Sequence, residues 1–195
     1  MSTNKFLTIT DAFPKVAQML NEGAVLLKND NNALPLKKGT AIAIFGEGQV
    51  NAYDGRVSTL TRQRGYIPFG AGSSRAYADG RLVAPLNALR EAEADGLVSI
   101  YAPLSACYER DVNYIPDADM ISSAAAVADT ALFFISRWAG ECRDMAAADW
   151  NLSLTERALL TDVCAAFDRV VVILNTSGPI DTAWACPVRI LARRL

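Results

Sequence analysis

The sequence predicts an α/β fold, a doubly wound and mostly parallel sheet with helices on both faces (an α/β sandwich). Four apolar runs of strand length are each followed by turn residues, and they cover residues 41–45, 97–101, 131–135 and 170–175. Uninterrupted apolar runs are typical of strands that are buried on both faces. Stretches with a helical pattern lie between these runs, and such alternation favours parallel strands joined by right-handed crossovers.

Each helix is predicted from local signals. The helical stretches cover residues 11–28, 82–94, 118–128 and 153–167. The first has apolar residues at helical spacing and is followed by the polar turn 29–35. The last opens with Ser153 and has Glu156 three residues later, which is the pattern of a capping box.

Two segments depart from this alternation. Residues 46–81 are rich in glycine and lack helical periodicity, so we expect a long functional loop or a partly ordered insertion there. Residues 188–191 resemble the start of another strand, but the sequence stops at Leu195. We therefore expect residues 1–195 to form a single domain whose last strand or helix is incomplete.

Charge and composition exclude several classes of partner. The net charge is −2 and the basic residues form no cluster, whereas nucleic acids and membrane surfaces attract a basic field. Neither a membrane-spanning apolar run nor a signal peptide is visible. We therefore expect a cytoplasmic protein with no nucleic-acid and no membrane partner. The 51% of hydrophobic residues, together with an unfinished sheet edge, predicts a homo-oligomer.

Acid–base chemistry in this chain has to rest on carboxylates, because the sequence contains no His. The same absence removes the commonest partner ligand for zinc, and the cysteines show no C-x-x-C spacing. No metal and no cofactor is predicted, and the cysteines are expected to be free thiols in a reducing compartment. They are Cys107, Cys142, Cys164 and Cys186.

Glu141 is the leading candidate for a chemical role. It lies on a Gly-containing turn directly after the apolar strand 131–135. Open α/β sheets bind their ligands in the crevice outside the carboxyl ends of their strands, so this position is placed to reach a ligand. A solvated loop is the ordinary role for a single Glu, and it is the default for the nearby Asp144 and Asp149. A paired carboxylate site or a metal site are the other readings of the three acids.

Two glycine motifs are weaker signals. Gly46-Glu47-Gly48 has two of the three glycines of a dinucleotide fingerprint, but Asn51 stands where the third belongs. A tight turn from strand to loop explains this motif without a cofactor. Residues 70–75 could cradle an anion with backbone N–H groups, but they lack the Lys of a P-loop. A flexible or sugar-contacting loop is favoured there.

Taken in order, several segments resemble the C-terminal α/β-sandwich domain of glycoside hydrolase family 3, the β-glucosidase family. Residues 22–29 with 34–36 are similar to the opening of that domain, and residues 41–46 to its first strand. Residues 70–74 resemble its Gly/Ser-rich loop near the active site. Further segments are similar to the region that carries the acid/base residue: 124–129, 133–137, 139–141 and 152–153 with Glu156. Residues 171–175 with 178–181 resemble the next strand and turn.

The resemblance implies a function that this chain only partly carries. The family hydrolyses β-linked glucosides or similar terminal sugars with retention, using one carboxylate as nucleophile and another as acid/base. Glu141 corresponds to the acid/base residue. The nucleophile is an Asp on a (β/α)8 barrel, which is absent from these residues, so the isolated chain is expected to be inactive. The expected neighbours of the sugar are Arg137, Gly72, Ser73, Ser74 and Arg75.

The chain also departs from the family pattern. Gly-Glu-Gly-x-Asp-Arg is typical of the family, whereas here Glu141 is followed by Cys142 and Arg143, and Met145 replaces the Arg. The Pro-Gly-Gln-Glu-Gly-Gly segment after the last strand is missing, and residues 186–195 only partly resemble what should follow, which suggests a truncation or an altered reading frame. A barrel encoded after this segment, in permuted order, is attractive because Met1 falls just before the first helix.

Two other classes of function compete with the enzyme. A non-catalytic carbohydrate-binding or protein-interaction module would use the same crevice, with Glu141 incidental. A flavodoxin-like nucleotide or regulatory domain is disfavoured, because the third Gly of the fingerprint and a clustered acidic pocket are both lacking.

Overall fold

The computed structural model describes residues 9–51, 83–137, 146–176 and 178–185 of the chain. These residues belong to two compact units, residues 1–35 and residues 36–195, and each is described by itself. The expected single domain over residues 1–195 stays a prediction, and the expected strand at 188–191 lies outside the described residues. No helix within the described ranges has the length and apolar character needed to cross a membrane.

The described residues of the first unit form an α-helix, a short 3-10 helix and a polar turn. Helix α1, Ile9–Gly23, ends earlier than the predicted stretch 11–28, and its last residue, Gly23, is of a type that disfavours helix. A short 3-10 helix follows at Asp30–Asn32. The Asn29 side chain closes the turn, because it accepts from Leu34 N and donates to Leu34 O at 2.9 Å in both cases.

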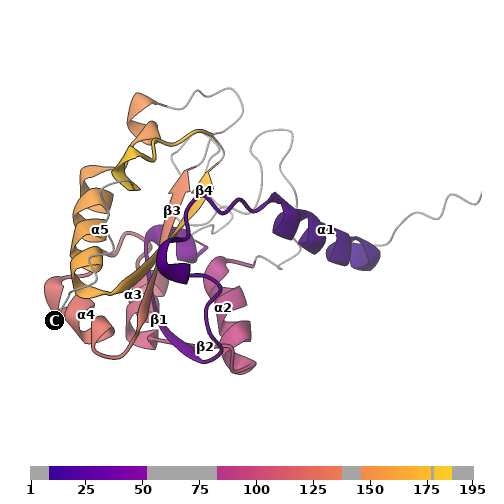
Figure 1. The fold of residues 1–195 in the computed structure, drawn as a ribbon, viewed down its shortest axis with the longest axis horizontal. Helices are drawn as coiled ribbons and strands as arrows, with labels where there is room; N and C mark the ends of the chain where they lie inside the picture. The colour runs from indigo at the N-terminus through magenta and orange to yellow at the C-terminus, as the bar shows by residue number, and fades with distance from the viewer. Residues whose placement is uncertain (1–8, 52–82, 138–145, 177, 186–195) are drawn as a thin grey trace, which may run out of the picture. The chain divides into compact units, whose positions relative to one another are not determined.

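The second unit is built on a parallel sheet of four strands in the order β2-β1-β3-β4 (Figure 1). Every pair of neighbouring strands is parallel, as the uninterrupted apolar runs predicted. The strands are β1 at Thr40–Phe45, β2 at Val98–Ile100, β3 at Thr130–Arg137 and β4 at Arg169–Thr176. The doubly wound, mostly parallel fold class predicted from sequence is therefore confirmed.

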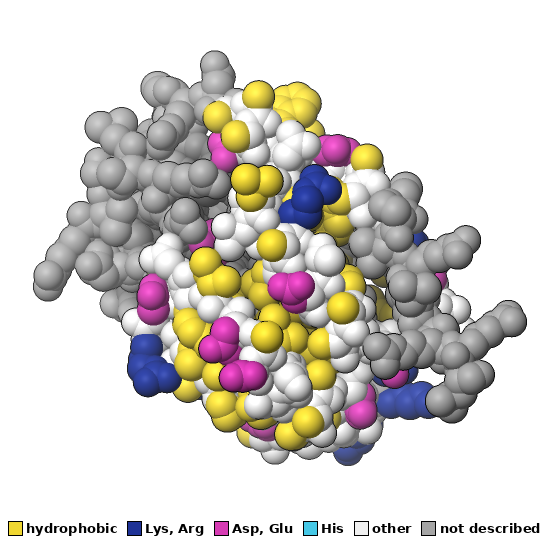
Figure 2. All heavy atoms as spheres, turned by 90° about the vertical axis from the view of Figure 1, so that its left-hand side faces the viewer, with side chains coloured by type: hydrophobic (Ala, Val, Ile, Leu, Met, Phe, Trp, Pro, Cys, Tyr) yellow, Lys and Arg dark blue, Asp and Glu magenta, His cyan; other side chains and the backbone are white. Residues whose placement is uncertain are grey.

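The helices of this unit lie on both sides of the sheet. α2, α4 and α5 are Pro85–Ala94, Ala118–Ala125 and Leu154–Ala166. α4 and α5 are neighbours on one side, and α2 is on the other (Figure 1). Because the chain steps from β1 to β2 and then back past β1 to β3, right-handed crossovers require this division. The face with α4 and α5 carries single acidic side chains dispersed among apolar ones (Figure 2).

The core lies between the sheet and these helices. β1 and β3 are its centre, and their inner side chains are at most 9% exposed from Ile42 to Phe45 and from Ala131 to Ile135. Phe45 meets Phe167 edge to face, with ring centroids 5.6 Å apart. Burial on both faces of these two strands is the reason that their sequences are apolar without alternation.

One helix was missed by the sequence reasoning. Helix α3 spans Ala102–Arg110 and was not predicted. It is short, and its buried residues, Leu104, Ser105 and Tyr108, include two polar side chains. An apolar stripe at helical spacing is therefore absent. The available signal was Pro103, since proline is favoured in the first turn of a helix.

Candidate functional site

The strand order places the switch point of the sheet between β1 and β3. β2 lies on one side of β1, and β3 and β4 lie on the other, so the direction of winding reverses between β1 and β3. Ligands of open α/β sheets bind outside the carboxyl ends of the strands at such a switch point. Phe45 pairs with Phe133, so β3 runs four residues beyond the end of β1 to Arg137.

The chain leaving β1 packs directly against β3. Gly46 has φ 90° and ψ 147°, and a Cβ built on it would lie 2.1 Å from the Phe134 carbonyl oxygen. At Gly48 a Cβ would lie 3.2 Å from that of Ser136. These contacts explain the Gly46-Glu47-Gly48 motif as a tight turn from strand to loop. The 3-10 helix Glu47–Gln49 begins there, at the start of the segment expected to be an irregular loop.

A buried polar cluster holds this turn. Gly46 N donates to the Tyr108 hydroxyl at 3.1 Å. Gln49 is fully buried, and its Nε2 donates to the carbonyl oxygens of Ile44 and Gly46 at 2.9 and 3.1 Å. Ser105 Oγ donates to Gln49 Oε1 at 3.3 Å. Burial raises the pKa of the Tyr108 hydroxyl above its usual range, so it stays neutral.

Tyr108→Phe is expected to destabilise the chain by about 1–3 kcal/mol, because the buried Gly46 N–H would lose its acceptor. Urea denaturation measures this change. Tyr114→Phe is the control, because the Tyr114 ring packs edge to face on Tyr108 while the side-chain bond to Gly46 comes from Tyr108. Equal stability of the wild type and Tyr108→Phe would show that the hydroxyl does not support the turn.

At the end of β3, Arg137 is 7% exposed and makes five hydrogen bonds to other described residues. Its Nε donates to Asp149 O at 3.0 Å, and its Nη1 donates to Ser136 O at 2.9 Å. Its Nη2 donates to Asn151 O at 3.0 Å. Nη1 and Nη2 each donate to one carboxylate oxygen of Glu156 at 2.7 Å. A guanidinium has five N–H groups, so each of them has an acceptor within the protein.

Glu156 also closes the N-terminus of α5. Its Oε2 accepts from Ser153 N at 2.8 Å, and Ser153 Oγ accepts from Glu156 N at 3.2 Å. The capping box predicted from the sequence is thus confirmed. Burial opposes ionisation of the Glu156 carboxyl, but the hydrogen bonds from Arg137 and Ser153 outweigh it, and the pKa lies below its usual range.

The Arg137–Glu156 pair is expected to make folding stability depend on pH. The pKa of Glu156 is lower in the folded than in the unfolded chain, where it is about 4.3. Its contribution to the free energy of unfolding is therefore fully present above that value, and is lost as the pH falls through the folded pKa. Glu156→Gln should make the loss of stability at acid pH, the acid limb of the stability curve, less steep. It should also lower the free energy of unfolding at pH 7 by about 1–3 kcal/mol. Urea titrations from pH 7 to pH 2 measure both effects, and an unchanged acid limb would contradict them.

The loops after β3 and β4 meet at the same edge of the sheet. Asp181 N donates to Trp150 O at 2.7 Å. Trp150 ends the 3-10 helix Ala147–Trp150, and Asp181 precedes the 3-10 helix Ala183–Ala185. Asp149 belongs to the first of these helices, and one of its carboxylate oxygens accepts from Ala146 N at 3.2 Å. This sequence-predicted acid therefore holds its own turn.

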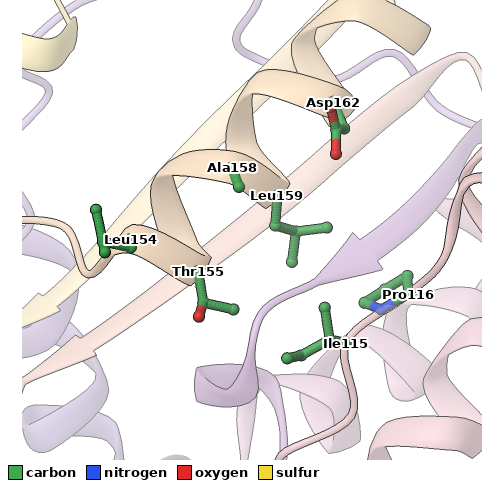
Figure 3. A pocket seen from close by; sticks show the side chains of 7 residues that line it. All are labelled: Ile115, Pro116, Leu154, Thr155, Ala158, Leu159 and Asp162. Atoms are coloured by element: carbon green, nitrogen blue, oxygen red, sulfur yellow. The ribbon is translucent and has the colours of Figure 1, made fainter.

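A groove lies elsewhere on this unit, between α5 and the chain before α4 (Figure 3). Its volume is about 360 Å³. The residues that line it are Ile115, Pro116, Leu154, Thr155, Ala158, Leu159 and Asp162. Asp162 is the one carboxylate among these lining residues, so the groove does not offer the two carboxylates of a glycosidase.

The sequence-predicted site residues are only partly within the described chain. Arg137 and Asp149 lie together at the carboxyl edge of β3. Glu141 and Asp144 lie outside the described residues, as do Gly72, Ser73, Ser74 and Arg75. A contact between Arg137 and a sugar stays a prediction, and it would compete with the bonds that Arg137 makes to described residues. Cys107 and Cys164 are free thiols, as expected, while Cys142 and Cys186 fall outside the described ranges.

The contacts of Gln49 and Tyr108 were not predicted from the sequence. Neither residue belongs to a motif, and hydrogen bonds between distant segments leave no periodic pattern in the sequence. Glu156 was identified as a helix cap, but its pairing with Arg137 joins residues far apart in the sequence. A buried Arg is normally paired with a carboxylate, so the apolar surroundings of Arg137 in the sequence could have indicated that it has such a partner.

Comparisons with known proteins agree with the fold. The model of the glycosyl hydrolase family 3 C-terminal domain matches residues 24–192. β-Glucosidase A of Butyrivibrio fibrisolvens is 29% identical over 209 residues, covering 84% of this chain and 22% of that protein. Probable β-glucosidase G of Aspergillus flavus is 31% identical, with 80% of this chain and 18% of that protein covered.

A solved structure gives the same result. A β-glucosidase of Paenibacillus barengoltzii matches with a TM-score of 0.73 and 25% identity, over 96% of this chain and 20% of that one. The chain thus spans about a fifth of the length of the proteins that it matches.

Proposed function

The chain belongs to the C-terminal domain family of family 3 glycosyl hydrolases, and on this premise we propose that it is the acid/base-carrying domain of a retaining β-glycosidase. It would act on a β-linked glucoside or oligosaccharide together with a (β/α)8 barrel domain. The observation that carries the proposal is where β3 ends. Its last residue is Arg137, at the switch point of the sheet, and Glu141 follows four residues later in the sequence.

In this mechanism Glu141 protonates the leaving-group oxygen and later removes a proton from the attacking water. An Asp of the barrel attacks the anomeric carbon and forms the covalent intermediate. The two carboxyl groups of a retaining enzyme are about 5–5.5 Å apart, so the barrel has to face the carboxyl edge of the sheet. Gly72, Ser73, Ser74 and Arg75 would line the sugar site from the loop after β1. The related proteins named above are β-glucosidases, which supports a β-glucoside as the substrate.

The isolated chain is expected to show no measurable hydrolysis of aryl β-glucosides, because one of the two carboxylates is missing. An assay of the purified 195 residues with p-nitrophenyl β-glucoside tests this expectation. Turnover that disappears in Glu141→Gln would overturn it, since a complete site would then lie within these residues. A cytoplasmic location and assembly into a homo-oligomer stay predictions from the sequence.

The proposal itself is tested in a fusion enzyme. In the fusion, this chain replaces the aligned segment of Butyrivibrio β-glucosidase A, so that the rest of that enzyme supplies the other domains. Hydrolysis of aryl β-glucosides that depends on Glu141 supports the catalytic role. A fusion that binds the sugar but hydrolyses it equally well after Glu141→Gln would favour a non-catalytic carbohydrate-binding module instead.

A further inference from the structure

We propose that Arg137 and Glu156 are a positioning pair for the acid/base carboxyl: they hold the two ends of the segment that carries Glu141 at a set separation. This inference rests on the proposed function, in which Glu141 is the acid/base residue. It assigns Arg137 a role through its protein contacts rather than through contact with the sugar.

The pair connects elements on both sides of residues 138–145. Arg137 is the last residue of β3 and lies before the segment. Its acceptors Asp149 O and Asn151 O lie after the segment, in and next to the 3-10 helix Ala147–Trp150. Glu156 lies in the first turn of α5. One side chain thus joins the strand, the turn and the helix.

Burial makes this connection stiff. The Arg137 side chain is 4% exposed and that of Glu156 is 23% exposed. Two parallel bonds of 2.7 Å fix the plane of the guanidinium against the carboxylate. Glu156 is itself fixed, because its Oε2 also accepts from Ser153 N at the helix terminus. Neither partner can turn away without leaving a buried charge or a buried N–H without a partner.

Such a connection matters for general acid catalysis. A carboxyl group donates its proton efficiently only when it lies within hydrogen-bond reach of the leaving oxygen. A displacement of about 1 Å can reduce the rate about 100-fold. The guanidinium of Arg137 joins position 137, before Glu141, to position 149, after it. This bond therefore limits how far apart the chain can be on the two sides of Glu141.

The chain contains a matched control for this pair. Arg90 and Glu109 form a similar two-bond pair at 2.6 and 2.9 Å between α2 and α3. Their side chains are 44% and 40% exposed. Exposed pairs contribute little, because water screens the charges and competes for the bonds. Arg90→Met therefore removes the same kind of bond at a site that does not frame Glu141.

The first measurement uses the 195-residue chain itself. Hydrogen exchange at the amides of Ala146, Asp149 and Asn151 should become at least about 10-fold faster in Arg137→Met and in Glu156→Gln, because the turn loses its anchor. Arg90→Met should leave these amides unchanged. Glu156→Gln keeps an oxygen for the capping box, so it reports on the pair even if Arg137→Met fails to fold. Unchanged exchange in both variants would overturn the proposal.

The second measurement uses the fusion with Butyrivibrio β-glucosidase A. Aryl β-glucosides with poor leaving groups need a proton from the acid, whereas 2,4-dinitrophenyl β-glucoside leaves without one. Arg137→Met should reduce kcat/KM for phenyl β-glucoside about 10- to 100-fold and for the dinitrophenyl substrate much less. Arg137→Lys should restore part of the loss, because it keeps the charge but not the planar fork.

The outcomes separate this inference from the proposed function. In one outcome, Glu141→Gln lowers kcat/KM more for phenyl β-glucoside than for the dinitrophenyl substrate, while Arg137→Met lowers kcat/KM equally for both. The proposed function then stands and the positioning role is wrong. If Glu141→Gln shows no such difference, or if the wild-type fusion is inactive, the proposed function fails and the positioning role fails with it.

Discussion

Gly46→Ala is expected to destabilise the chain by about 3–5 kcal/mol, which is a large part of the stability of an ordinary domain. The added Cβ would lie 2.1 Å from the Phe134 carbonyl oxygen and 3.0 Å from its carbon. Both atoms are backbone of the central strand β3, so they cannot move aside as a side chain would. The φ of 90° adds strain, because residues with a Cβ rarely adopt it. The two effects, of about 1–3 kcal/mol each, act together.

The control for this variant is Gly96→Ala. Gly96 also has a positive φ, 68°, but nothing lies within 4 Å of its added Cβ. It should therefore show the backbone strain alone, at about 1 kcal/mol. Urea denaturation of both variants separates the close approach from the strain. Equal destabilisation of the two variants would mean that the chain after β1 does not press against β3.

The sheet was predictable from the sequence because its strands are buried on both faces. β1 and β3 have to be apolar at nearly every position, and runs this short that are bounded by turn residues favour strands over helices. Their observed bounds, Thr40–Phe45 and Thr130–Arg137, differ from the predicted ones by at most two residues at each end. Burial thus leaves a strong local signal.

Elements held by polar contacts left no such signal. Helix α3 packs through Tyr108 and Ser105, whose bonds reach Gly46 and Gln49 more than fifty residues away. Local periodicity cannot show a contact at that distance. The end of α1 was also misplaced. The apolar residues after Gly23 continue the helical spacing in the sequence, but the helix ends at Gly23.

The strand before the candidate site was predictable, but the contacts at its end were not. The apolar strand followed by Gly140 and Glu141 led to the prediction of a site at the carboxyl end of β3, with Arg137 as a neighbour of the sugar, and both assignments stay predictions. The bonds of Arg137 to Glu156, Asp149 and Asn151 came only from the structure. From sequence, a charged side chain at the end of a strand suggests a contact with a ligand. In the structure, the charge of Arg137 is paired instead with Glu156, which caps helix α5.

Glu141→Gln is expected to reduce kcat/KM of the fusion enzyme for phenyl β-glucoside by about 100- to 10,000-fold, which is the usual contribution of general acid–base catalysis. Gln has nearly the same shape but carries no transferable proton. Glu91→Gln is the matched control, because it makes the same change on the exposed side of α2. A loss of equal size in both variants would point to damage of the fold rather than to loss of the acid.

The most direct test of the acid/base assignment is the product formed by Glu141→Ala in the fusion enzyme with added azide. With 2,4-dinitrophenyl β-glucoside the covalent intermediate forms without an acid, but water attacks it slowly because the general base is missing. Azide needs no base, so we expect it to raise the rate and to yield β-glucosyl azide, whereas the wild-type fusion yields glucose. Formation of glucose alone, at a rate that azide does not change, would contradict the assignment of Glu141 as the acid/base residue.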